Sequence, residues 1–153
     1  MGLEHISDGT SQTAGVAEFC RGDWFGRDVT RLVLKSHSPG VAGDRLGRLV
    51  SECLKLELSE KNTDGAIKGV TWMSQALGQT LYNHTLPPNE RSCTNDPGTI
   101  QEGAWTAGSQ HPGGVNVLFL DGHVSFKRAT ILLSVWRAIG TMNNNEAISG
   151  EDN

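Results

Sequence analysis

Residues 111–127 carry the sequence HPGGVNVLFLDGHVSFK, which we expect to fold as a β-hairpin. Every second residue from Val115 to Phe119 is apolar, as in a strand that buries one face. Asp121-Gly122 is typical of a two-residue type I′ turn, because both central residues of that turn need a positive φ. The sequence therefore predicts a C-terminal hairpin over 115–127 that forms the firmest part of a small antiparallel sheet.

Helical periodicity predicts two helices around this hairpin. Apolar residues recur at helical spacing over residues 44–58, and a second stripe runs from Ile131 to Ile139. Thr130 is a good N-cap for the second helix, and Gly140 stands where a C′ glycine belongs. We expect at least helix 44–58 to pack on the hairpin sheet, which gives an α+β fold class.

The sequence also predicts several shorter elements. Residues 14–19, 29–35 and 70–73 favour strands, whereas the glycine- and proline-rich stretch 36–43 is a connector. Residues 87–110 are rich in turn-forming residues and read as one long loop. Loops of that length are often functional or held by a cross-link.

Length and composition indicate one soluble domain. The chain has 153 residues and a net charge of −4, and its 13 basic residues are scattered, so no nucleic-acid partner is expected. We expect one globular domain over residues 1–142 and a polar tail over residues 143–153. The sequence has no apolar run long enough for a membrane span and no export signal at its start.

The three cysteines, Cys20, Cys53 and Cys93, leave their redox state open. None belongs to a C-x-x-C pair, so no zinc site of the usual spacing is expected. The loops lack the dense alternation of carboxylates that calcium prefers, so no metal or cofactor is expected. The odd number leaves at least one thiol unpaired within the chain. One disulfide is compatible with an oxidising compartment, and three free thiols are compatible with a reducing one.

Several segments resemble those of one known family. His111, nine residues and then Asp121-Gly122 reproduce the motif of the pseudopilin-like H-X9-DG family (domain of unknown function 1559) of planctomycete-type bacteria. Four further blocks resemble that family in the same order: residues 6–13 with Glu18, residues 83–93, residues 108–117 and residues 136–141. The motif residues are His111, Pro112, Gly113, Gly114, Asn116, Asp121 and Gly122.

The resemblance implies a pilin- or pseudopilin-like head with a structural or assembly role and no catalytic activity. Members of this kind carry a prepilin leader and a long apolar N-terminal helix, and neither occurs in this sequence. The implied location is the cell surface or the exterior, and the implied partners are other pilin-like subunits or surface proteins. Cys53 and Cys93 match two family cysteines, so the resemblance also implies a disulfide between them.

Two other functions stay open at this stage. Loop 87–110 could make the chain a secreted glycan- or protein-binding module. His111, His123 and Asp121 could serve a metal-dependent hydrolase, but His111 and Asp121 stand at opposite ends of one predicted strand. At about 3.3 Å per residue, that strand separates them by roughly 20 Å, so we expect His111 to tie down a loop and Asp121 to shape the turn.

Overall fold

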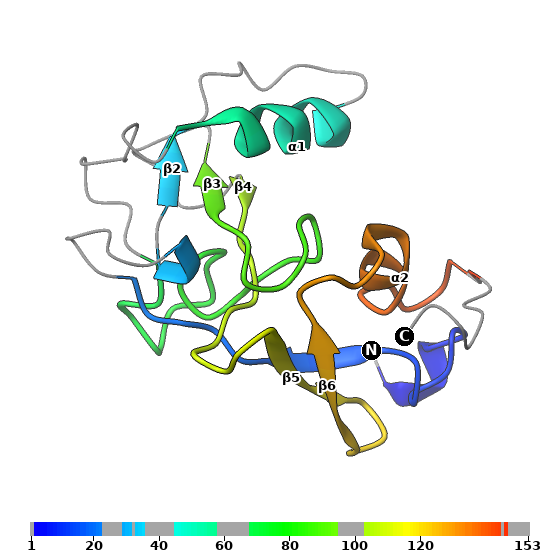
Figure 1. Ribbon diagram of the computed structural model, residues 1–153. Coiled ribbons are helices and arrows are strands. Elements are labelled where there is room, and N and C mark those ends of the chain that lie inside the picture. The colour runs from blue at the N-terminus through cyan, green and yellow to red at the C-terminus, as the bar shows by residue number, and fades with distance from the viewer. Residues whose placement is uncertain are drawn as a thin grey trace.

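The predicted hairpin is present in the computed structural model, which describes residues 2–22, 29–31, 33–35, 45–57, 68–94, 103–144 and 146 (Figure 1). Its strands are β5 (Gly114–Phe119) and β6 (Val124–Arg128). Strand β1 (Ala14–Ala17) pairs with the other edge of β5, so the first sheet is antiparallel with the order β1-β5-β6. A short 3₁₀ helix, η1 (Leu3–His5), precedes β1.

The turn differs from the predicted type I′ turn. Among the described residues only Asn89 and certain glycines have a positive φ; Gly122 is one of them at +95°, and Asp121 is not. The Gly122 amide donates to the Phe119 carbonyl at 3.0 Å, and the Phe119 amide donates to the His123 carbonyl at 2.9 Å. The connection is therefore a three-residue loop over 120–122, which needs a left-handed residue only at its last position.

One face of the first sheet is covered by helix α2 (Leu133–Ala138). The fully buried Val115 and Val117 of β5 pack here with Trp136 and Ile139. The other face of the sheet points away from α2 (Figure 1).

The predicted N-cap of this helix is wrong, whereas Gly140 occupies the predicted C′ position, directly after the C-cap Ile139. The helix begins at Leu133, and its N-cap is Leu132 without a side-chain hydrogen bond. The chain from Arg128 to Ile131 is held in a turn by the Ile131 amide and the Arg128 carbonyl, which keeps Thr130 outside the helix. Gly140 is not left-handed; a Cβ there would lie 2.5 Å from the His84 ring, so the glycine provides space for that ring.

A second sheet contains β2 (Val33–Lys35), β3 (Ser92–Thr94) and β4 (Gly103–Ala104). β2 is parallel to β3 and β3 is antiparallel to β4, so this sheet is mixed. Part of the predicted loop 87–110 therefore forms strands, because it pairs with a distant part of the chain. The predicted strand 29–35 begins with the 3₁₀ helix η2 (Val29–Arg31), and the predicted strand 70–73 is a series of turns.

Helix α1 (Arg45–Lys55) packs on this second sheet and not on the hairpin sheet as predicted. Its Cys53 forms a disulfide with Cys93 of β3, with Cα atoms 5.9 Å apart. Leu34, Leu86 and Ala104 complete the buried cluster. The α+β class is confirmed, but it is built from two small sheets, each with its own helix.

Some predictions lie outside the described residues. These include the connector 36–43 and most of the polar tail beyond Asn144. Within the described part of the chain, no helix has the length and apolar character needed to cross a bilayer.

Candidate functional site

The motif residue His111 lies in the turn that leads into β5. Its side chain is 57% exposed, and its Nε2 lies 3.1 Å from a carboxylate oxygen of Glu18, which follows β1. Its backbone amide donates to the Ser109 hydroxyl at 2.9 Å. His111 therefore connects the entrance of β5 to the end of β1.

Glu18 is the centre of this connection. Its second carboxylate oxygen accepts the Asn116 amide at 2.7 Å and lies 3.4 Å from the Asn116 side-chain nitrogen. Burial alone would raise the pKa of Glu18, but these hydrogen bonds and the charge of His111 outweigh burial and leave that pKa below its usual value. The site favours a carboxylate that braces β1 against β5.

Asn89 and Ser109 extend the network to the other side of the motif. Both donate through their side chains to the Gly114 carbonyl, at 3.1 Å and 2.9 Å, and Asn89 also accepts the Ser109 amide at 2.8 Å. Asn89 has a φ of +64°, a conformation that asparagine tolerates better than most residues. A Cβ at Gly114 would lie 2.2 Å from the Lys127 carbonyl, so this motif glycine permits close pairing with β6.

We call His111, Glu18, Asn116, Asn89 and Ser109 the strand clasp. Sequence reasoning named His111 and Asn116 as motif residues but assigned no role to the other three. Glu18, Asn89 and Ser109 stood inside the blocks that resemble the H-X9-DG family, which was the available signal. Their spacing along the chain could not reveal that they meet.

Asp121 makes a separate set of contacts at the hairpin turn. Its Oδ1 accepts the His123 amide at 3.1 Å and lies 2.6 Å from His123 Nδ1. The His123 ring stacks on Phe119 with centroids 4.4 Å apart. The hydrogen bond from the His123 amide, followed by that from its side chain, lowers the pKa of Asp121. The structure thus pairs Asp121 with His123, and His111 with Glu18.

A hollow of about 380 Å³ lies beside this turn. Ser11, Ser125 and Lys127 are among its lining residues, together with Phe119 and His123. Burial lowers the pKa of Lys127. In the described part of the chain, His123 pairs with Asp121, and neither Ser11 nor Ser125 hydrogen-bonds to it.

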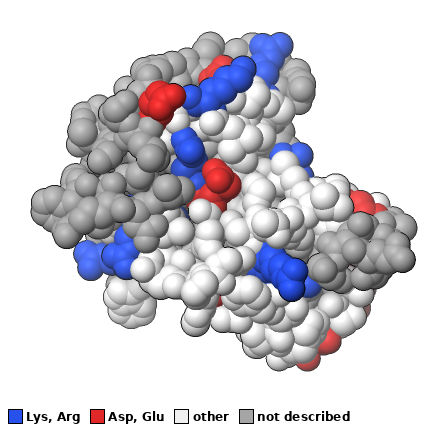
Figure 2. Space-filling model, in the orientation of Figure 1, with Lys and Arg blue, Asp and Glu red and all other residues white. Residues whose placement is uncertain are grey.

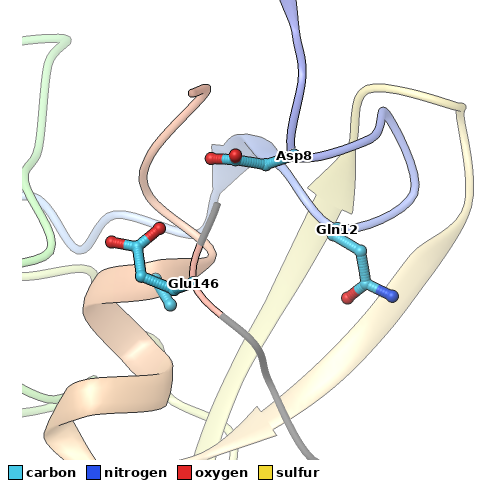
Figure 3. Close-up of a pocket in the computed structure, with 4 residues that line it drawn as sticks. Asp8, Gln12 and Glu146 are labelled. Carbon is cyan, nitrogen blue, oxygen red and sulfur yellow. The ribbon is translucent and has the colours of Figure 1, made fainter. Parts of the chain in front are cut away.

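A smaller hollow of about 160 Å³ lies between the segment before β1 and the end of α2 (Figure 3). The Thr141 hydroxyl oxygen lies 3.2 Å from an Asp8 carboxylate oxygen and 3.1 Å from a Glu146 carboxylate oxygen. No group of three or more His, Cys, Asp or Glu residues suited to a metal ion occurs in the described residues.

The uncovered face of the first sheet carries a row of apolar side chains. Val16 of β1 is 59% exposed and pairs with Leu118 of β5, which pairs in turn with Val124 of β6, 62% exposed. Phe126 extends the row and is 46% exposed. We call these four residues the open apolar face. On the side of the molecule drawn in Figure 1, acidic and basic side chains are interspersed rather than gathered by sign (Figure 2).

Fold and contacts together define an α+β protein in which the strand clasp braces two strands and a disulfide fixes a second sheet. The chain belongs to the family described as protein of unknown function (DUF1559), whose model matches residues 1–131. This confirms the resemblance seen in the sequence. No match was found among curated proteins or among solved structures.

Proposed function

We propose that the chain is a non-catalytic structural or assembly component, the globular head of a pilin-like protein at the cell surface or outside the cell. Its partners in this proposal are other pilin-like subunits or surface proteins. The open apolar face is the observation that carries the proposal.

An apolar row across all three strands is costly to leave in water. Burying one such side chain stabilises by about 1.5–3 kcal/mol, and large exposed apolar patches typically mark interaction surfaces. Val16, Leu118 and Val124 stand in register, so they present one continuous ridge to a partner. A pilin-like subunit with an apolar helix would cover this ridge.

The roles of the motif residues support a structural rather than a chemical function. His111 and Asp121 bind different partners, Glu18 and His123, and both sets of contacts hold backbone segments in place. The Cys53–Cys93 disulfide supports a location in an oxidising compartment.

Fractionation of the native host, carrying a tagged gene, tests this proposal. We expect the tagged protein in the sheared surface fraction or the medium, together with a pilin-like subunit. Leu118→Lys combined with Val124→Lys should abolish that association while the purified variant keeps its thermal unfolding midpoint. Leu54→Lys is the matched control, because Leu54 is 49% exposed on α1. A tagged protein that stays inside the cell would refute the proposal.

A further inference from the structure

The segment from Gly69 to Leu81 carries a second apolar surface. Trp72 is 83% exposed and Met73 is 73% exposed, and they are flanked by Val70 at 45% and Leu81 at 47%. We call these four residues the tryptophan tip. The segment runs along the margin of the molecule away from α2 (Figure 1).

The base of the tip is firmly held. The buried Gln79 accepts the amides of Val70 and Thr71 through its Oε1, at 3.1 Å and 2.8 Å. The Gly69 amide donates to the Gly78 carbonyl at 2.7 Å, which closes the segment. The exposed apolar side chains are therefore presented by an ordered loop.

The loop also satisfies its own backbone near the tip. The amides of Gln79, Thr80 and Leu81 converge on the Ala76 carbonyl, and the Thr80 hydroxyl donates to the Ser74 carbonyl. Hydrogen bonds between backbone groups of the same loop matter in an apolar medium, because an unpaired amide there costs several kcal/mol. These hydrogen bonds lower the number of unpaired backbone groups that the C-terminal half of the segment would carry out of water.

The absence of charged side chains around the tip narrows the class of partner. The sequence has no Asp, Glu, Lys or Arg from Gly69 to Asn89. A protein cleft would have to match the shape of the tip, and a glycan site usually adds charged or amide groups that bind hydroxyls. A bilayer surface needs no matching shape, and tryptophan favours its interface.

We propose that the tryptophan tip inserts into the interface of a bilayer with zwitterionic headgroups. This inference does not depend on the proposed function, because it uses a different surface. The net charge of −4 disfavours binding to anionic lipids, so apolar burial supplies the attraction.

Sedimentation with phosphatidylcholine vesicles tests the inference. The wild-type protein should bind, and its tryptophan emission should shift to the blue. Trp105 and Trp136 are fully buried, and the part of the signal lost in Trp72→Ala isolates the tip. We expect binding roughly tenfold weaker in Trp72→Ala and weaker also in Met73→Ala.

Leu3→Ala is the matched control, because Leu3 is 61% exposed on η1, and it should bind like the wild type. Each of several outcomes would overturn the inference. The first three concern binding: no binding to phosphatidylcholine vesicles, binding of Trp72→Ala as strong as that of the wild type, or binding only to anionic vesicles. The other two concern tryptophan emission: a blue shift with a soluble neutral glucan but not with vesicles, or a blue shift that depends on protein concentration alone.

Discussion

Glu18 and His84 show how single residues hold the fold of this protein. Glu18 accepts hydrogen bonds from Asn116 and pairs with the exposed His111. His84 is largely buried; it stacks on Trp136 with centroids 4.1 Å apart, and its Nδ1 lies 2.6 Å from the Trp136 carbonyl. The two sites predict different responses to mutation and pH.

The strand clasp should depend more on the Glu18 hydrogen bonds than on the Glu18–His111 ion pair. Glu18→Ala leaves the Asn116 amide without its acceptor and should cost about 1–3 kcal/mol of unfolding free energy. Glu18→Gln keeps an acceptor and should cost less. His111→Ala should cost under about 1 kcal/mol, because exposed ion pairs contribute little. Urea denaturation measures all three, and a His111→Ala cost equal to that of Glu18→Ala would contradict this ranking.

His84 should make the protein less stable in mild acid. Burial lowers the pKa of His84 from 6.5 to about 4, although its hydrogen bond to Trp136 opposes the shift. Between these pH values the unfolded chain binds a proton that the folded chain does not, so stability falls as pH falls from 6.5 to about 4. The linked loss is about 3 kcal/mol.

Denaturation of the wild type and of His84→Gln across this pH range isolates the effect. The carboxylates contribute to both proteins, so the difference in slope belongs to His84. Identical slopes would show that His84 does not carry the linkage.

At the scale of elements, the sequence predicted local structure better than it predicted which strands pair with one another. The alternation in 115–119 and the Asp-Gly step were sufficient for the hairpin, and apolar periodicity was sufficient for α1. β3 and β4 were missed because each is at most three residues long and exists only through pairing with other segments. The clasp was missed in part for the same reason, since Glu18 and Asn116 are 98 residues apart.

The disulfide should stabilise the second sheet strongly. It closes a loop of 40 residues between α1 and β3, so its loss should lower the unfolding free energy by about 3–4 kcal/mol. Cys53→Ala with Cys93→Ala, or a reducing agent, should produce this loss in guanidinium denaturation. Cys20→Ser should not, because Cys20 is a free thiol. An equal loss in the Cys20 variant would contradict the assignment.

Gly78 tests how tightly the tip segment packs on the core. Its φ is +79°, and a Cβ there would lie 2.6 Å from the ring of the buried Trp105. Gly78→Ala should therefore cost about 2–4 kcal/mol from overpacking and backbone strain. Gly9→Ala is the control: its φ is +91° but its Cβ would meet nothing within 4 Å, so only about 1 kcal/mol of strain is expected. Thermal unfolding compares them, and equal costs would show that Trp105 yields to the added methyl group.

At the scale of the molecule, two small sheets are each covered by one helix, and the first sheet keeps an apolar face in solvent. The resemblance predicted the family, and the alternation predicted that Val115, Val117 and Phe119 share the buried face, but no pattern within 115–127 showed that Leu118, Val124 and Phe126 would stay exposed. Burial by α2 on one side decides it. The proposed assembly role depends on a partner protein covering the open apolar face on the other side of the sheet.

Photo-crosslinking in intact cells of the native host tests that claim most directly. A photoreactive amino acid at position 124 should cross-link the protein to a pilin-like subunit that mass spectrometry can identify, whereas the same group at position 54 on α1 should not. No cross-link from position 124, or the same products from both positions, would contradict the proposal that the open apolar face is the assembly surface.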